Sequence, residues 1–490
     1  MTSSKSTKRA LISSTLAILM CVAMLIGTTF AWFTDTASTG VNKIVSGNLK
    51  VDIIGADSDS HIEKLNFTKA ATTDAEAGAE ILWEPGCRYL TEGFRIANKG
   101  NLALKWKAQV NTGTTAANEG NFDLLDVIDF YLVTKAADGT ETETALDEFT
   151  GNLKKTETSD VYYIKGVMQT TAGNDYQGLT LDGISITVVA TQDTVESDSF
   201  DNQYDKDAEY PILVTTGDEL QAIVSNATAP VNIVLTNSIT TNNFVISEDK
   251  DVTLDLNGRT VTNAGSHTIL NKGHLTLTDS SADKSGQIIS LKGNTAALRN
   301  GDNAVCVVEG GTISRDGANG NTWHVVENFG KMTFNGGKVV LKNGNGFAIT
   351  NGWNYFDPGA STTHAVMEIN ALELDTDSSG IKNCRYGDLT VNDVTVTSTG
   401  YWALSNDYLG TAVINGGTLT SNSFKAVSNG AAMTVNGGTF DGTQGFFVQS
   451  YATSTVLNGG TFTNMNVNAL SNYVGTGHTA QQSGTSVIIK

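Results

Sequence analysis

The chain has 490 residues, a formal net charge of −20 at pH 7, and only 17% charged residues. The acidic balance argues against a nucleic-acid-binding protein, because such proteins neutralise phosphates with basic patches. Hydrophobic residues make up 40% of the chain, which is enough to build cores and excludes an intrinsically disordered protein.

The N-terminus has the pattern of an export signal. Three basic residues among the first nine precede an uncharged apolar stretch, residues 11–26, and small residues stand at positions −3 and −1 of a cut after Ala31. This pattern predicts a signal peptide over residues 1–31, cleaved between Ala31 and Trp32. The alternative is an uncleaved membrane anchor, although the apolar core is shorter than the ~20 residues that a membrane span needs.

The segment from Gly27 to Asp35, with its aromatic pair Trp32-Phe33, resembles the export signal of the TasA/camelysin family of Gram-positive bacteria. In that family a dedicated SipW-type signal peptidase cuts before the aromatic pair. Residues 42–52 are similar to the segment that follows in family members. The resemblance implies an extracellular protein, located at the cell surface or in the biofilm matrix of a Gram-positive bacterium.

Residues 32–208 are expected to form an antiparallel β-sandwich. Several runs alternate apolar and polar residues, which is typical of strands with one buried face. These runs are 49–54, 93–97, 102–110, 128–133 and 184–190. Residues 98–101, Asn-Lys-Gly-Asn, predict a hairpin turn between the second and third of them.

Two further parts of this region resemble TasA/camelysin signatures: residues 83–86 with 98–106, and residues 190–200 with Tyr204-Asp205. The resemblance implies a jelly-roll-like sandwich and a role in extracellular fibres, where some members polymerise by passing an N-terminal strand to a neighbour. By that analogy the segment passed to a neighbour, which we call the assembly strand, would span Trp32 to Thr39 and begin with Trp32, Phe33, Thr34 and Asp35. The alternative is that these residues pack in their own chain as an edge strand.

Residues 209–251 are expected to form a linker and the N-terminal cap of a solenoid. Thr216 to Glu219 fits a capping box, the signature of a helix start. Leu220, Ile223 and Val224 would share one face of that helix. A short helix of this kind would cover the open end of a solenoid core.

From residue 252 to residue 490 a short phrase recurs, in which an apolar residue is followed by Asn-Gly-Gly-Thr or a degraded copy. Its asparagines, at positions 370, 392, 415, 436 and 458, lie 22, 23, 21 and 22 residues apart, and a period of this length is typical of solenoids. Apolar residues stand three places and one place before the asparagine in most copies, for example Leu254 and Leu256, Leu389 and Val391, and Met433 and Val435, and another apolar residue stands four places after it. Together with the helix and the run 231–235, the phrase resembles the start of pectate-lyase-like β-helices. We therefore expect an all-β protein whose sandwich is followed by a right-handed parallel β-helix.

A second column lies about ten residues earlier in each coil. It consists of an aliphatic residue, a mostly polar residue and an asparagine. The aliphatic members are Ile269, Val326, Ile349, Ile381, Leu404, Val427 and Leu470. The middle members are expected to face water; they include Glu327, Thr350, Lys382, Ser405, Ser428, Gln449 and Ser471. The apolar positions before the repeat asparagine, those after it and the second column predict three short strands per coil, because the side-chain period within each is that of a strand. At about 22 residues per coil, residues 252–490 hold about ten coils.

The coil between Asn335 and Asn370 is longer than its neighbours, and insertions in solenoids form loops that often lie on the binding face. The insertion holds Trp353, Tyr355 and Phe356, and Trp402 stands in a later coil. We expect these four aromatic residues to form a glycan-stacking platform. The alternative is that they pack onto their own coil.

No catalytic, metal or cofactor site is predicted. Many β-helices are polysaccharide lyases, which need a basic proton abstractor and acidic calcium ligands, but Lys382, Arg385, Asp388 and Asp357 stand singly rather than in successive coils. Camelysin-like proteins have been catalogued as metallopeptidases, yet the chain has no HExxH and only one histidine, His61, in the first domain. The three cysteines beyond residue 31 have no CxxC spacing, and we interpret them as small buried residues; a Cys306–Cys384 bridge is the alternative.

The sequence therefore predicts a secreted, non-enzymatic, fibre- or adhesin-like protein of the cell surface or biofilm matrix, whose β-helix serves for spacing or glycan contact. The alternative is a carbohydrate-active β-helix enzyme of the polysaccharide-lyase type. Expected partners are other copies of the chain and extracellular glycans or cell-surface components, without nucleic acid. Contact with a membrane is expected only through the signal peptide before its cleavage.

Overall fold

The computed structural model describes residues 48–62, 65–68, 81, 83–111, 114–115, 122–146, 149–182, 185–193, 209–263, 265–317, 323–353 and 363–490. The fold is all-β, with antiparallel sheets followed by a parallel β-solenoid of about ten turns, which confirms the predicted fold class. The predicted cleavage site after Ala31 and the predicted assembly strand from Trp32 to Thr39 lie outside the described residues. Within the described part of the chain, no helix has the length and apolarity required to cross a membrane.

Two antiparallel sheets make up the first part of the chain. The larger consists of β1 (Val51–Gly55), β4 (Phe94–Asn98), β10 (Tyr162–Met168), β3 (Arg88–Thr91), β2 (Phe67–Thr68), β7 (Ile128–Lys135) and β8 (Glu141–Ala145). The smaller consists of β12 (Ser185–Gln192), β5 (Leu104–Asn111) and β9 (Phe149–Leu153). A separate pair joins β11 (Leu181–Asp182) to β6 (Thr114–Thr115), and two short 3-10 helices span Leu124–Asp126 and Asn174–Tyr176.

The two sheets enclose one apolar core. Phe94 and Ile96 of β4 pack with Leu104 and Trp106 of β5, and all four are at most 1% exposed. Alternation explains this arrangement, since every second residue of each strand points to the same face. The Trp106 ring meets Phe149 of β9 edge to face, with 5.6 Å between ring centroids.

The predicted hairpin at residues 98–101 is wrong, because β4 and β5 belong to different sheets. The turn is an arch across the sandwich, held by the buried Asn98. The Asn98 Nδ2 donates to Leu102 O at 2.7 Å and to Lys154 O at 3.1 Å, and Gly100 N donates to Asn98 Oδ1 at 2.9 Å. Alternating strands direct their apolar residues into one core equally well from opposite sheets, so the pattern did not distinguish an arch from a hairpin. Strands β2, β3, β6, β8, β9, β10 and β11 were not predicted.

The solenoid begins with β13 (Ile212–Val214) and the helix α2 (Gly217–Asn226), within the segment predicted as linker and cap. Thr216 is the N-cap, and its side chain accepts a hydrogen bond from Glu219 N at 3.2 Å. The Glu219 carboxylate in turn accepts from Thr215 N at 2.9 Å. Leu220 and Val224 of the helix are fully buried against the first coils, which agrees with a capping helix.

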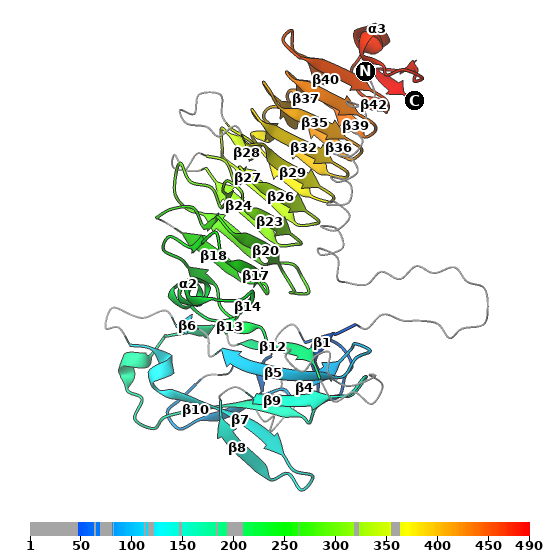
Figure 1. The fold of residues 1–490 in the computed structure, drawn as a ribbon. Coiled ribbons are helices and arrows are strands. Elements are labelled where there is room, and N and C mark those ends of the chain that lie inside the picture. Colours follow the sequence, from blue (N-terminus) through cyan, green and yellow to red (C-terminus); the bar gives the residue numbers. More distant parts are fainter. Residues whose placement is uncertain are drawn as a thin grey trace, which may run out of the picture. The chain divides into compact units, whose positions relative to one another are not determined.

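Each coil contributes one strand to each of three parallel sheets, and Figure 1 shows the strands of the first sheet succeeding one another from β17 to β35. After β13 the first sheet contains β14 (Val231–Leu235), β17 (Asp251–Asp255), β20 (His274–Thr278), β23 (Val305–Val308), β26 (Lys331–Phe334), β29 (Ala365–Ile369), β32 (Gly387–Val391), β35 (Thr411–Ile414), β38 (Ala432–Val435) and β41 (Ser454–Leu457). The second contains β15 (Ile239–Thr240), β18 (Thr260–Asn263), β21 (Gln287–Ser290), β24 (Thr312–Asp316), β27 (Lys338–Lys342), β30 (Glu373–Thr376), β33 (Thr395–Ser398), β36 (Thr418–Ser421), β39 (Thr439–Asp441) and β42 (Gly460–Phe462). The third contains β16 (Val245–Ile246), β19 (Ile269–Asn271), β22 (Leu298–Asn300), β25 (Val326–Asn328), β28 (Phe347–Asn351), β31 (Ser379–Asn383), β34 (Leu404–Asn406), β37 (Lys425–Asn429) and β40 (Gln444–Val448).

The predicted apolar columns line the interior of the solenoid. Leu254, Leu389 and Val435 belong to one continuous core cluster. The residues predicted three places and one place before their asparagines are at most 2% exposed: Leu254, Leu256, Leu389, Val391, Met433 and Val435. The period read from the sequence was therefore the period of the coils.

Two ladders of asparagine side chains run along the solenoid. The inner ladder ends the strands of the third sheet and comprises Asn271, Asn300, Asn328, Asn351, Asn383, Asn406 and Asn429, each at most 1% exposed. Each Nδ2 except that of Asn429 donates to Oδ1 of the next coil's asparagine at 2.7–2.9 Å. The outer ladder lies at the repeat phrase and comprises Asn335, Asn370, Asn392, Asn415, Asn436 and Asn458. Its amides donate in the opposite direction, to the preceding coil, at 2.7–2.9 Å.

The C-terminal end departs from the predicted repeat. Leu470 was expected in a strand column, but it lies in the helix α3 (Val467–Leu470), which is followed by a 3-10 helix (Ser471–Tyr473) and by β43 (Ala480–Ser483) and β44 (Ser486–Ile489). Strand β44 pairs antiparallel with β42 and ends the parallel series. Leu470 is still 1% exposed within the solenoid core. The prediction was wrong because Asn466 caps a helix here, while the apolar-polar-Asn pattern is the same in both settings.

Candidate functional site

The outward side of the third sheet is less exposed than predicted. Of the middle-column residues expected to face water, Glu327 is 3%, Thr350 6% and Ser428 1% exposed, so the prediction is wrong for these three. Lys382 and Ser405 are half-buried. The physical reason is that neighbouring side chains fold over the sheet; Gln449, for example, donates to Ser428 Oγ at 3.0 Å. This side of the solenoid is therefore a covered surface rather than a bare strand face.

Glu327 is the central charged group of that surface. Strands β22 and β25 place Arg299 directly opposite Glu327, and Arg299 Nη1 lies 3.0 Å from Glu327 Oε2. From the corner before β25, Trp323 Nε1 donates to Glu327 Oε1 at 2.9 Å. A buried carboxylate needs such partners, since desolvation of an unpaired charge is costly. The pair was not predicted, although the sequence holds a signal for it: Arg299 and Glu327 each stand directly before an asparagine, that is, at the same position in two successive coils.

Aromatic stacking continues the network across the sheet. The Arg299 guanidinium lies 4.6 Å from the centroid of the Phe329 ring. The Phe329 ring in turn lies 4.5 Å, centroid to centroid, from Trp353. One chain of contacts therefore runs across the third sheet, from the N-terminal ends of its strands to their C-terminal ends. It passes through Trp323, Glu327, Arg299, Phe329 and Trp353.

Two histidines lie beside this network and are neutral near pH 7. Burial lowers the pKa of His267 and, likewise, the pKa of His324. His267 Nδ1 accepts from Ala296 N at 2.8 Å. His324 Nδ1 lies 3.0 Å from Phe347 O, and because a carbonyl only accepts, this nitrogen carries the proton. Neither ring is placed to act as a cation.

The geometry of the network favours structural contacts over proton transfer. Both Glu327 oxygens have a donor within 3.0 Å. Three other residues weighed as catalytic candidates are engaged separately. Lys382 pairs with Asp407 at 3.2 Å, Asp388 with His364 at 2.8 Å, and the Arg385 guanidinium stacks 4.7 Å from the Tyr386 ring centroid; Asp357 lies outside the described residues. Among the described residues, no group of three or more His, Cys, Asp or Glu side chains could hold a metal ion.

The structure separates Trp353 from Trp402, two of the four aromatic residues predicted as a glycan platform. Trp353 follows β28 and Trp402 precedes β34, so one lies beyond the C-terminal ends of the strands of the third sheet and the other before their N-terminal ends. Trp402 packs edge to face on Phe424, with 5.0 Å between ring centroids. The indole nitrogens of Trp353 and Trp402 are buried and have no hydrogen-bond partner among the described residues. Tyr355 and Phe356 lie outside the described residues.

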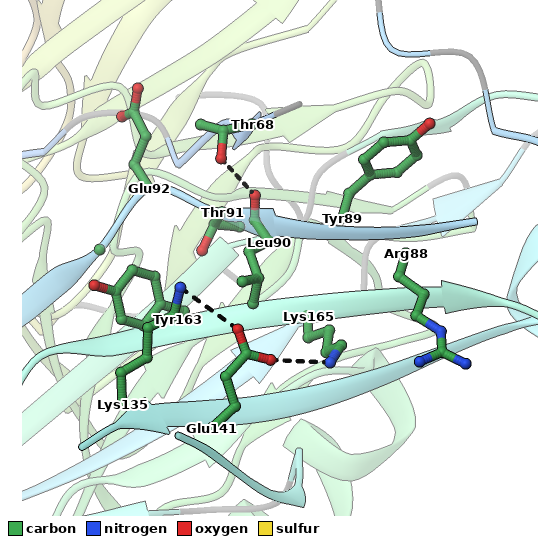
Figure 2. A pocket seen from close by; sticks show the side chains of 11 residues that line it. Thr68, Arg88, Tyr89, Leu90, Thr91, Glu92, Lys135, Glu141, Tyr163 and Lys165 are labelled. Carbon is green, nitrogen blue, oxygen red and sulfur yellow. Dashed lines mark hydrogen bonds and ion pairs between the residues drawn. The ribbon is translucent and has the colours of Figure 1, made fainter. Parts of the chain in front are cut away.

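A shallow hollow of about 430 Å³ lies on the larger sheet of the sandwich, between β3, β7, β8 and β10. Figure 2 shows Glu141 between Lys135 and Lys165 at this place, with Tyr163 beside Lys135. Lys135 Nζ lies 4.6 Å from the centroid of the Tyr163 ring. This site was not predicted, although the alternation in Tyr162–Met168 is a strand signal that places Tyr163 and Lys165 on one face.

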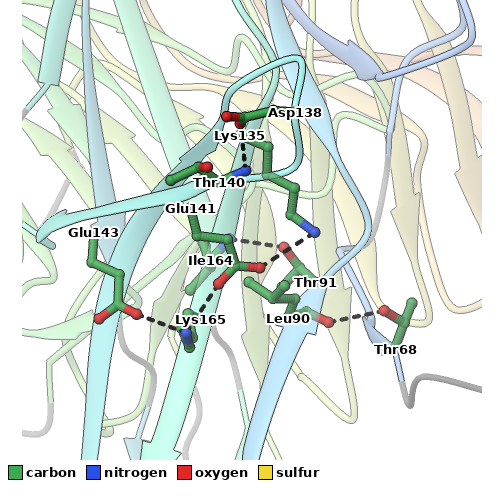
Figure 3. Close-up of polar contacts among 10 residues, drawn as sticks. All are labelled: Thr68, Leu90, Thr91, Lys135, Asp138, Thr140, Glu141, Glu143, Ile164 and Lys165. Carbon is green, nitrogen blue, oxygen red and sulfur yellow. Dashed lines mark hydrogen bonds and ion pairs between the residues drawn. The ribbon is translucent and has the colours of Figure 1, made fainter.

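The charged groups of the hollow hold one another in their ionised forms. Figure 3 shows Lys165 between two carboxylates, 2.7 Å from Glu143 and 3.1 Å from Glu141. The hydrogen bond with Glu143 raises the pKa of Lys165, and the hydrogen bond with Lys165 lowers the pKa of Glu141. A lysine whose pKa is raised cannot serve as a base near neutral pH. The hollow offers paired charges for contact, not a proton acceptor.

The cysteines of the described residues are free. Cys306 and Cys384 are buried in different coils, and the Cys306–Cys384 bridge is not formed. Burial raises the pKa of each of these two thiols to about 12. They behave as small apolar core residues, as the spacing in the sequence suggested, and Cys87 is half-buried in the sandwich.

The fold places the chain in the class of all-β proteins that join antiparallel sheets to a parallel β-solenoid. Comparison of the chain with protein-family models, with curated proteins and with solved structures found no match in any of the three.

Proposed function

We propose that this protein is a secreted, non-enzymatic component of the bacterial cell surface or biofilm matrix, in which the solenoid is a stiff spacer that contacts glycans. The signal-peptide pattern over residues 1–31 and the resemblance to TasA/camelysin proteins support export. The paired state of Glu327, Lys382 and Asp388 supports a role without catalysis, because each of these groups already has an ionic partner.

The observation that carries the proposal is the solenoid of about ten coils. At the ~4.8 Å spacing of neighbouring strands, ten coils extend about 50 Å. The two asparagine ladders bond each coil to the next over most of that length, so bending would break hydrogen bonds on two sides. Such a rod holds whatever it carries at a constant distance, which is the property that a surface spacer requires.

Fractionation of an expressing Gram-positive host tests the proposal. The protein is expected in the surface or matrix fraction, with an N-terminus at Trp32 by protein sequencing. Deletion of residues 32–39 should abolish fibres seen by electron microscopy if these residues form the assembly strand, and should leave secretion unchanged. Recovery of the protein in the cytoplasmic fraction would contradict the proposal.

The second candidate is a carbohydrate-active β-helix enzyme, favoured by one observation: the buried Glu327 lies between Arg299 and Trp323 on the outward side of a sheet. Incubation with polygalacturonate, xylan and alginate, followed by detection of new reducing ends and of unsaturated products, tests for turnover. Glu309 is the control carboxylate; it follows β23 and accepts from Asn335 Nδ2 at 2.8 Å. Turnover that is lost in Glu327→Gln and kept in Glu309→Gln would establish this alternative in place of the spacer.

A further inference from the structure

A patch of exposed tyrosines follows the corner where the third sheet turns into the first. It comprises Tyr386, Tyr408, Leu409 and Tyr451, which we call the corner patch. Tyr408 is 46%, Leu409 40% and Tyr451 55% exposed, while Tyr386 is half-buried. Large apolar side chains that gather on a surface mark interaction sites more often than single exposed ones do.

The corner patch is continuous along the solenoid. Tyr386 N donates to Leu409 O at 3.3 Å, and Gly430 N donates to Asn406 O at 2.7 Å, so successive corners are bonded to one another. The Tyr451 ring packs onto Gly430 and fills the space that a side chain at this position would need, since a β-carbon at Gly430 would lie 2.7 Å from Tyr451 Cε2. The patch thus spans four consecutive coils, with aromatic rings contributed by three of them.

Backbone strain accompanies two members of the corner patch. Tyr386 and Leu409 both adopt a φ of 59°, a left-handed conformation that Gly and Asn adopt readily and bulky residues avoid. Elsewhere in the solenoid, asparagines such as Asn257 and Asn343 occupy this conformation. Strained residues persist where the surroundings hold them in place, and they cluster at binding sites.

Polar groups beside the rings remain accessible. The His364–Asp388 pair, at 2.8 Å, has side chains 52% and 41% exposed, and the His364 ring lies 5.5 Å from Tyr386. Asp407, which pairs with Lys382 at 3.2 Å, is 38% exposed and immediately precedes Tyr408. Hydroxyl groups of a ligand could therefore bond to carboxylates while its apolar faces lie on the tyrosine rings.

We propose that the corner patch binds a neutral glycan chain lying parallel to the solenoid axis, with sugar rings stacked on Tyr408 and Tyr451. Stacked aromatic rings with a few placed polar groups are the usual composition of a small-ligand site. The charge of −20 on the whole chain and the carboxylates of Asp388 and Asp407 disfavour an acidic glycan. The inference rests on the proposed glycan contact and names its surface and its sugar class.

Affinity electrophoresis of the purified secreted chain tests the inference, with hydroxyethyl cellulose, xylan and galactomannan as neutral polymers and polygalacturonate as the acidic one. At least one neutral polymer should retard the wild-type chain, and Tyr408→Ala combined with Tyr451→Ala should raise the dissociation constant at least tenfold. Tyr401→Ala is the matched control, because Tyr401 is also 55% exposed but precedes β34, at the opposite end of the strand from the corner patch. Unchanged urea midpoints would show that the variants fold.

Four results would overturn the inference. Three come from electrophoresis: no retardation by any neutral polymer, retardation by polygalacturonate alone, or equal losses in the Tyr401 and Tyr408/Tyr451 variants. The fourth comes from light scattering: self-association that disappears in the Tyr408/Tyr451 variant would identify the patch as an interface between copies instead. The location of the protein in cells decides the proposed function separately. A surface protein whose variants bind as the wild type does would leave the spacer role intact and remove only the corner patch.

Discussion

The inner asparagine ladder allows a quantitative prediction at Asn383, which has a ladder neighbour on each side. The side chain is fully buried. Its Nδ2 lies within hydrogen-bond distance of Gly387 O at 2.9 Å, Asn406 Oδ1 at 2.8 Å and Thr411 O at 3.0 Å. Its Oδ1 accepts from Asn351 Nδ2 at 2.9 Å. Replacement by alanine removes all of these bonds from a place that water does not reach.

The expected loss follows from counting bonds. An amide Nδ2 has two hydrogens, so Asn383→Ala removes about three full hydrogen bonds, two donated and one accepted. At roughly 1 kcal/mol for each bond, with an added cost for buried groups left unsatisfied, the free energy of unfolding should fall by about 3–5 kcal/mol. The matched variant is Asn415→Ala in the outer ladder. Asn415 makes two equivalent amide bonds, at 2.7 Å and 2.8 Å, but is exposed, so water replaces them and the loss should be about 0.5–1 kcal/mol.

Urea unfolding of the full chain, followed by circular dichroism, measures both losses, and hydrogen exchange of the amides in β31 and β34 locates them. Exchange is needed because a solenoid can unfold in segments, which makes a single unfolding free energy incomplete. Equal losses for Asn383→Ala and Asn415→Ala, or a loss below about 1 kcal/mol for Asn383→Ala, would refute the reasoning that buried amide ladders hold the coils together.

Three further predictions concern protons, thiols and export. Because burial lowers the pKa of His324, the stability due to its neutral form is complete above the unfolded value of about 6.5 and is lost as the pH falls below it; wild-type urea midpoints should therefore drop more between about pH 7.5 and about pH 5.5 than those of His324→Gln, and equal drops would contradict this. A thiol reagent should label Cys87 in the native secreted chain and reach Cys306 and Cys384 only after denaturation, since burial raises the pKa of the two core thiols to about 12; their rapid native labelling would count against the closed core. Replacing Ala31 with a bulky residue, Ala31→Trp, should cause the uncut precursor to accumulate in membranes, as judged by its mass, because signal peptidases need a small residue there.

The repeat determined the fold of the second half without help from tertiary structure. An apolar residue at fixed positions around each asparagine can be buried in only one way when the period is about 22 residues, so the three-stranded coil and the interior positions of Leu254, Leu389 and Val435 followed directly. Alternation likewise identified β1, β4, β5, β7 and β12. These signals are local, because each depends on residues that are close in the sequence.

Only the tertiary structure decided which strands face each other and which side chains are covered. The turn at Asn98 joins two sheets rather than one hairpin because its amide bonds to Lys154, more than fifty residues away. Glu327 is buried because Arg299 stands opposite it one coil earlier and Trp323 folds over it. Tyr408 and Tyr451, ordinary loop residues in the sequence, become neighbours of one corner only when the coils are stacked. Contacts between coils depend on registration across the sheets, and no local pattern carries that information.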